Sequence, residues 1–132
     1  MKDRVLVIDD TEDVRASTQL ALQAEGFQVS VAANGREGMS LLRKQVADVV
    51  VTDILMPEQD GVETIAQLRK EFPHIKIIAI SGGLSRTGFD YLLVPTQLGV
   101  ARILRKPFDI RDLVRLIREL IPQTEKSKDP EH

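Results

Sequence analysis

Short apolar runs alternate with longer amphipathic stretches along this chain. Residues 5–8 are all aliphatic and mostly β-branched, as expected for a strand that is buried on both faces of a sheet. Four further runs predict strands at residues 27–32, 49–52, 76–81 and 102–105. The stretches between these runs have helical spacing, so the pattern predicts strands that are joined by helices.

Capping residues, glycine and proline indicate where the helices begin and end. The pattern predicts helices at residues 11–25, 35–44, 62–72 and 110–121. Gly26 follows the first helix and is typical of a helix C-terminus, whereas Pro73 and Pro122 stop the third and the last. Asn34 and Asp109 stand at N-cap positions.

The alternation predicts a doubly wound α/β fold, in which five parallel strands carry helices on both faces of the sheet. Residues 82–98 fit this pattern poorly, because three glycines and Pro95 interrupt any helix, and a short helix around residues 90–94 is the most they support. We expect residues 1–122 to form one domain and residues 123–132 to form a flexible polar tail.

Composition narrows the class of protein. The chain has 132 residues, the length of a single domain, and no cysteine, which excludes disulfides and thiolate chemistry. Its 18 basic and 20 acidic side chains give a net charge of −2, which argues against direct nucleic-acid binding. The apolar runs are too short to span a membrane and the N-terminus lacks a signal-peptide core, so we expect a cytoplasmic protein.

Polar residues lie at the ends of four predicted strands. Asp9 and Asp10 follow the first strand, and Asp53 follows the third. Ser81 ends the fourth strand, and Lys106 follows the fifth. The carboxyl ends of parallel strands meet at one edge of the sheet, where doubly wound folds bind ligands. We therefore expect these five side chains to share one rim.

The expected rim carries more negative than positive charge. Two carboxylates about 4 Å apart repel by about 4 kcal/mol at an effective dielectric constant of about 20, and one lysine does not neutralise three of them. Either a pKa rises or a cation binds. Oxygen ligands suit Mg²⁺, and a rim holding Mg²⁺ and Lys106 would attract a phosphoryl group. Asp53 is then the best-placed nucleophile, Asp10 a direct metal ligand and Asp9 a ligand through water. The Ser81 hydroxyl would donate to a phosphoryl oxygen.

Each of these residues also has a plain structural explanation. Asp9 and Asp10 are suited to capping a helix, Asp53 and Ser81 to turns, and Lys106 to a solvated position. The occurrence of all of them at the ends of different strands is much harder to explain in this way.

Four motifs occur in a characteristic order: VLVIDD at residues 5–10, VVVTDILMPEQDG at 49–61, ISG at 80–82 and KPF at 106–108. Together they resemble the receiver domain of two-component response regulators, including the chemotaxis regulator. The resemblance covers about residues 3–121 and implies a flavodoxin-like sheet with the strand order 2-1-3-4-5.

The resemblance also implies a mechanism. Asp53 would accept a phosphoryl group from a histidine kinase or a histidine phosphotransfer protein. Mg²⁺ would be held by Asp10, Asp53 and the backbone carbonyl of Leu55, with Asp9 acting through water. Lys106 and Ser81 would contact the phosphoryl oxygens. Phosphorylation would change how a downstream protein binds the face built from the family's fourth helix (here within residues 82–98), fifth strand (102–105) and fifth helix (110–121), and hydrolysis would reset the switch.

The chain departs from the family pattern in two places. Many receivers have Tyr or Phe three residues before the lysine, where this chain has Ile103, so a signal read by burying an aromatic ring is not available there. The irregular residues 82–98 fall on the family's usual output surface.

On the last predicted helix, Arg111, Arg115 and Arg118 share one side, which favours a solvated surface over an acidic partner.

Three functions are consistent with these residues. The leading interpretation is a phosphoacceptor module for signal transduction that catalyses its own phosphorylation and dephosphorylation but is not otherwise an enzyme. The alternative is a phosphate-independent interaction module, favoured by Ile103 and by the irregular residues 82–98 and opposed by the complete acidic set. A small Mg²⁺-dependent phosphohydrolase ranks last, because no second domain forms a substrate pocket and no spare general acid lies near Asp53.

Overall fold

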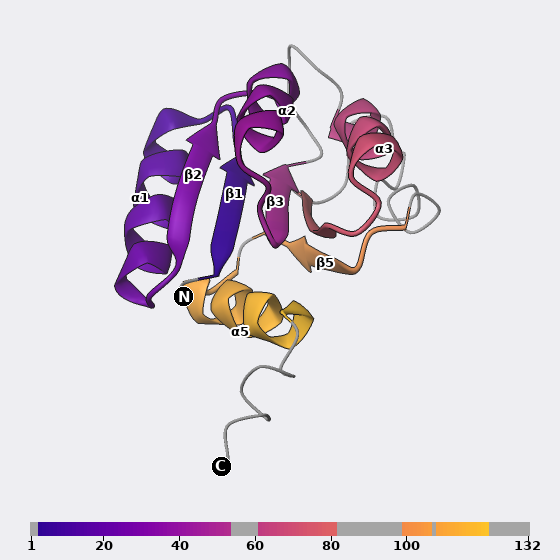
Figure 1. The fold of residues 1–132 in the computed structure, drawn as a ribbon. Coiled ribbons are helices and arrows are strands. Elements are labelled where there is room, and N and C mark those ends of the chain that lie inside the picture. The colour runs from indigo at the N-terminus through magenta and orange to yellow at the C-terminus, as the bar shows by residue number, and fades with distance from the viewer. Residues whose placement is uncertain (1–2, 54–60, 82–98, 107, 122–132) are drawn as a thin grey trace, which may run out of the picture.

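The computed structural model describes residues 3–53, 61–81, 99–106 and 108–121. Its elements (Figure 1) are, in chain order, β1 (Arg4–Ile8), α1 (Glu12–Ala24), β2 (Gln28–Ala32), α2 (Gly35–Lys44), β3 (Val49–Asp53), α3 (Gly61–Glu71), β4 (Lys76–Ser81), β5 (Arg102–Arg105) and α5 (Ile110–Leu120). Each of these strands and helices lies within one residue of its predicted bounds at either end. The short helix predicted around residues 90–94 and the polar tail at 123–132 fall outside the described residues.

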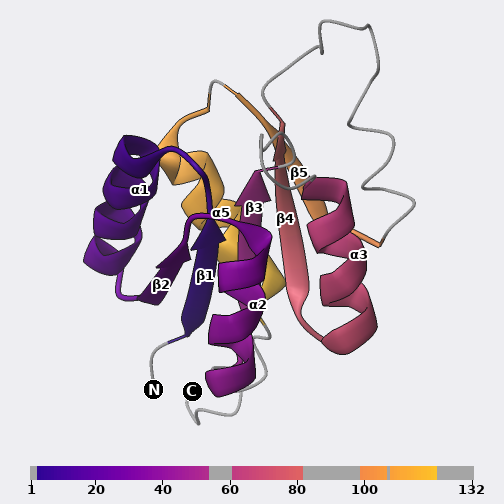
Figure 2. The ribbon, with the colours of Figure 1, turned by 90° about the horizontal axis from the view of Figure 1, so that it is seen from above.

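The five strands form one parallel sheet in the order β2-β1-β3-β4-β5, which confirms the predicted fold class. Helices α1 and α5 pack on one face of the sheet and α2 and α3 on the other (Figures 1 and 2). β3 lies in the middle of the sheet and is buried along its whole length. β2 lies at an edge, where Gln28 and Ser30 are exposed.

Successive residues of each central strand enter opposite layers of the core, because side chains alternate along a strand. The layer under α2 and α3 contains, among others, Leu6, Ile8, Val50, Ile77 and Ala79. The layer under α1 and α5 contains, among others, Val5, Val7, Val49, Val51 and Ile78. Burial on both faces explains the continuous apolar runs, and it fixes the strand ends that carry the polar residues.

Local hydrogen bonds set the ends of two helices. At the start of α2 the Asn34 side chain accepts from the Glu37 N–H at 2.9 Å, and the Glu37 carboxylate accepts from the Ala33 N–H at 2.6 Å. Asp109 caps α5 as predicted and accepts from the Arg111 N–H at 2.8 Å. These caps fix where each helix begins relative to the sheet.

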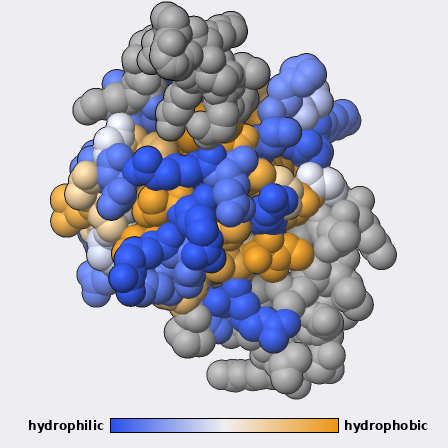
Figure 3. All heavy atoms as spheres, turned by 90° about the horizontal axis from the view of Figure 1, so that it is seen from below, coloured by the Kyte–Doolittle hydropathy of each residue, from blue (hydrophilic) through white to orange (hydrophobic). Residues whose placement is uncertain are grey.

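The surface near α5 mixes polar and apolar residues. In Figure 1, α5 lies below the sheet, and Figure 3 views the molecule from that side, where hydrophilic residues form a band between hydrophobic ones. Among the described residues, no helix combines the length and apolar character that a membrane crossing requires.

Candidate functional site: an acidic rim at the sheet's carboxyl edge

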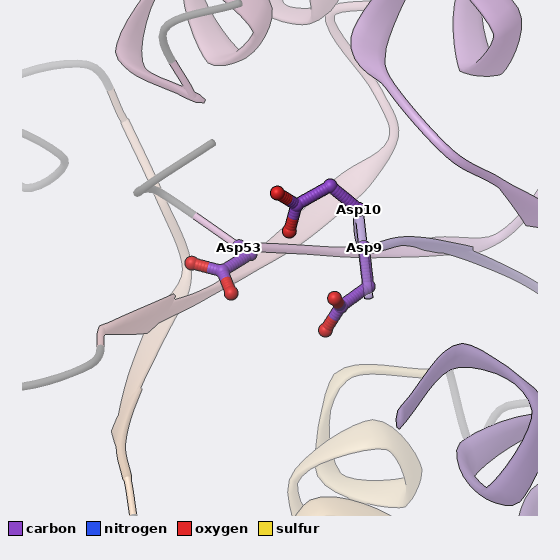
Figure 4. Close-up of side chains that lie close together, drawn as sticks. All are labelled: Asp9, Asp10 and Asp53. Atoms are coloured by element: carbon purple, nitrogen blue, oxygen red, sulfur yellow. The ribbon is translucent and has the colours of Figure 1, made fainter. Parts of the chain in front are cut away.

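Three carboxylates lie together at the ends of two paired strands. Asp9 and Asp10 follow β1 directly, and Asp53 is the last residue of β3. Oxygen atoms of the three side chains lie within 4.8 Å of one another (Figure 4). Asp9 and Asp53 are only 3% and 6% exposed, whereas Asp10 is exposed. The structure thus brings together the three acids that the sequence placed at one rim.

Lys106 contributes the one basic group that the sequence analysis placed at this rim. Its Nζ lies 3.1 Å from Oδ2 of Asp53 and donates a hydrogen bond to it. The lysine side chain is 34% exposed, compared with 7% for Asp53. The lysine therefore contacts a buried carboxylate while its side chain remains partly open to solvent.

Asp9 is held by its neighbours on several sides. Its Oδ1 accepts from the Thr11 N–H at 2.9 Å, and its own N–H donates to the Ala32 carbonyl at 3.1 Å. Burial is the main cause that raises the pKa of Asp9; the Thr11 hydrogen bond lowers it, and the repulsion of Asp53 raises it. Burial is thus the main reason that the pKa of Asp9 is raised, and the negative charges of Asp53 and Asp10 add to the rise while Lys106 opposes it.

The donor set fits a magnesium ion. The described side chains that converge here offer carboxylate oxygens, which are hard ligands, and the charge they carry is repulsive without a cation. Asp9, Asp10 and Asp53 together could hold a metal ion, with Asp10 on the exposed side. Leu55, whose carbonyl is the third predicted ligand, lies outside the described residues.

Two other predicted residues are placed by the backbone. Ser81 ends β4, where it pairs with Arg105 of β5, so it lies at the same carboxyl edge as the acids. Ile103 pairs with Ala79 and packs, partly buried, against the core layer under α2 and α3. An aliphatic side chain thus occupies the strand position where many receivers have an aromatic ring.

Sequence reasoning missed two residues that contact the acidic rim. Nη1 of Arg15, in the first turn of α1, donates to the backbone carbonyl of Asp9 at 2.8 Å. The buried hydroxyl of Thr52 donates to the backbone carbonyl of Asp53 at 3.3 Å. One signal was available for the arginine: helix side chains lean toward the helix N-terminus, so a long side chain one turn into α1 reaches back over the acidic turn.

The arginines of α5 form a different kind of cluster. Arg111, Arg115 and Arg118 pair with Asp109, Asp112 and Glu25 at 2.8, 3.3 and 2.9 Å. Their side chains are 86%, 63% and 46% exposed, which agrees with the predicted solvated surface. The Arg118 guanidinium also lies 5.3 Å from the centre of the Phe27 ring, so it ties α5 to the start of β2.

Comparison with known proteins shows the class to which this fold and rim belong. Residues 5–118 match the model of the response regulator receiver domain. The chain belongs to this family, whose members act as signalling domains in two-component systems and are generally not enzymes. Receiver domains interact with histidine kinases and with downstream effectors.

Individual relatives place the chain further within this class. It is 32% identical over 124 residues to the response regulator MprA of Mycolicibacterium vanbaalenii, covering 94% of this chain and 52% of that protein. It is 34% identical over 119 residues to the sensor kinase CckA of Brucella abortus, covering 89% of this chain and 12% of the kinase. The chain therefore spans about half the length of the MprA relatives that it matches.

Solved structures agree with the fold. The CheY-like receiver domain protein of Methanospirillum hungatei superposes with a TM-score of 0.84 at 28% identity, covering 96% of this chain and 99% of that one. The chemotaxis protein CheY4 of Vibrio cholerae gives a TM-score of 0.83 at 25% identity, covering 92% of this chain and all of that one. These likenesses confirm the predicted receiver family and its strand order.

Proposed function

We propose that this domain accepts a phosphoryl group on Asp53 in the presence of Mg²⁺ and thereby switches the binding of a downstream protein. One observation carries the proposal: three carboxylates lie within 4.8 Å of one another, and a lysine contacts the one at the end of the central strand. Among the described residues, three carboxylates that share one lysine ammonium are suited to hold a divalent cation and a phosphoryl group together.

Asp10, Asp53 and the Leu55 carbonyl are the proposed Mg²⁺ ligands, with Asp9 acting through water. The bound ion would supply positive charge that allows the dianionic phosphoryl group to approach the carboxylates. Burial of Asp9 and Asp53 favours this arrangement, because water screens their charges less than it would at the surface.

In the proposed step, a carboxylate oxygen of Asp53 attacks the phosphorus atom of a phosphohistidine. The new bond joins that oxygen to phosphorus, and the phosphorus–nitrogen bond breaks with its electron pair going to the imidazole, which takes up a proton. Lys106 donates to a phosphoryl oxygen, and the Ser81 hydroxyl donates to another. Hydrolysis of the acyl phosphate by water releases phosphate and restores the Asp53 carboxylate.

The donor would be a histidine kinase or a histidine phosphotransfer protein, and the output would pass through the fourth helix, β5 and α5. The family's fourth helix would fall within residues 82–98, which lie outside the described residues, whereas β5 and α5 lie on the side of the sheet next to Lys106. Ile103 packs against the core layer as an aliphatic side chain, so we expect the signal to pass through the backbone after Ser81 and not through an aromatic rotamer.

Intact mass after incubation with Mg²⁺ and acetyl phosphate tests this function. We expect one phosphoryl adduct, which disappears in EDTA and in Asp53→Asn. Asp112→Asn, which removes an acid from α5, is the matched control and keeps the adduct. A protein without any adduct would be a phosphate-independent interaction module, and rapid donor turnover without a standing adduct would indicate a phosphohydrolase.

A further inference from the structure

The turn between β1 and α1 is tied down by an arginine that the proposed chemistry does not use. Arg15 lies in the first turn of α1, is half-buried, and donates from Nη1 to the backbone carbonyl of Asp9 at 2.8 Å. The N-cap residue Thr11 makes no side-chain capping hydrogen bond. The arginine therefore links this helix start to the end of β1, in addition to the hydrogen bond between the Thr11 N–H and the Asp9 carboxylate.

This contact fixes more than one residue. The Asp9 N–H donates to Ala32, its Oδ1 accepts from Thr11, and its carbonyl accepts from Arg15. Because a peptide unit is planar, holding the Asp9 carbonyl also orients the N–H and Cα of Asp10. Asp10 is exposed, so burial does not orient it as it orients Asp9 and Asp53.

The charge of Arg15 would act against a cation, while its hydrogen bond would act in favour of one. A guanidinium near the rim repels Mg²⁺, so removing its charge would by itself strengthen Mg²⁺ binding. Loosening the Asp9–Asp10 peptide would weaken Mg²⁺ binding, because the groups that orient metal ligands contribute strongly to metal affinity. The two effects change the Mg²⁺ affinity in opposite directions, so the direction of the change in a single variant shows which effect is larger.

We propose that Arg15 is a positioning residue of the Mg²⁺ site, which holds the Asp9–Asp10 peptide so that the exposed Asp10 carboxylate meets Asp53. This inference rests on the proposed function. Arg15 donates to a backbone carbonyl and leaves the carboxylate oxygens available, which is the arrangement expected of a group that orients ligands without competing with the ion.

Calorimetric titration of the unphosphorylated protein with Mg²⁺ tests the proposal directly, without any phosphoryl donor. We expect Arg15→Met to bind Mg²⁺ about tenfold more weakly than the native protein. Arg15→Lys retains the charge and one donor but not the planar fork, so its affinity should fall between the two. Arg115→Met, which removes an arginine that pairs with Asp112 within α5, should bind as the native protein does. Thermal unfolding of each variant reports its stability separately.

The outcomes are distinct. Tighter Mg²⁺ binding by Arg15→Met would show that only its charge matters, and unchanged affinity with a lower melting temperature would show a purely structural role; either result overturns the proposal. If Arg15→Met does not fold, Arg15→Lys decides: weaker binding supports the proposal and native affinity overturns it. If the native protein itself binds no Mg²⁺, the proposed function fails instead.

Discussion

The acidic rim and the arginines of α5 both concentrate charge, but they balance it differently. Each α5 arginine pairs with an acid, and these side chains are largely exposed. At the rim, three carboxylates lie near one lysine, and two of them are buried. Exposed, balanced pairs contribute little free energy, whereas buried, unbalanced charge is costly until a ligand compensates it. The balance and burial of the charge, more than its amount, distinguish the candidate site.

The largest expected difference between the two regions concerns the basic residues. Lys106→Met removes the donor to Asp53 and the charge that would stabilise the transferring phosphoryl group, so we expect phosphorylation by acetyl phosphate to slow by about 100-fold. Arg115→Met, the same type of change on α5, should leave the rate unchanged. Mass spectrometry over time measures both rates, and equal rates for the two variants would contradict the assigned role of Lys106.

The acids should differ in the same way. Asp10→Asn removes a proposed Mg²⁺ ligand, and we expect its Mg²⁺ affinity to fall at least about tenfold. Asp112→Asn removes an acid of α5 that pairs with Arg115, and its affinity should equal that of the native protein. Titration calorimetry makes the comparison. A native affinity in Asp10→Asn would remove this residue from the site.

Neutralising a buried acid should stabilise the protein when no metal is present. Asp9→Asn retains an oxygen that can accept from the Thr11 N–H, but it removes a buried charge beside Asp53. We expect its melting temperature in EDTA to rise by a few degrees above that of the native protein. In Asp112→Asn, which loses an ion pair, no rise is expected. A lower melting temperature in Asp9→Asn would show that the buried charge of Asp9 does not destabilise the metal-free protein.

The smallest effect should appear at Asp109, where we expect the free energy of unfolding to depend on pH. Hydrogen bonds from the Arg111 side chain, followed by the one from its backbone N–H, lower the pKa of Asp109 from 3.8 to about 2. A lowered pKa stabilises the folded state above the unfolded value and loses that contribution as the pH falls through about 2. Asp109→Asn keeps an N-cap acceptor but has no charge. Denaturant unfolding at several pH values should show that the native protein is slightly more stable than Asp109→Asn above about pH 5. The difference in the free energy of unfolding between the two proteins should shrink as the pH is lowered.

Much of the fold could be predicted because its signals are local. The run at residues 49–52 predicted a strand, and Asn34 and Asp109 marked helix starts; the structure confirms all three. The acidic rim followed from topology, since Asp9, Asp10 and Asp53 all end or follow parallel strands.

What could not be predicted depends on how side chains meet in three dimensions. Asp9 and Asp10 are adjacent in sequence and both follow β1, yet Asp9 is buried and Asp10 is exposed. The position of Arg15 one turn into α1 indicates that its side chain can reach back over the acidic turn, but its contact with the Asp9 carbonyl and the position of Arg118 over Phe27 depend on side-chain rotamers that the sequence does not specify.

A crystal structure determined with Mg²⁺ and beryllium fluoride, which imitates a phosphoryl group, tests the central claim most directly. The account predicts a beryllium atom bonded to a carboxylate oxygen of Asp53, a fluoride next to Nζ of Lys106, and a magnesium ion held by Asp10 and Asp53. Beryllium fluoride bound to a different residue, or an ion bound away from these two acids, would contradict it.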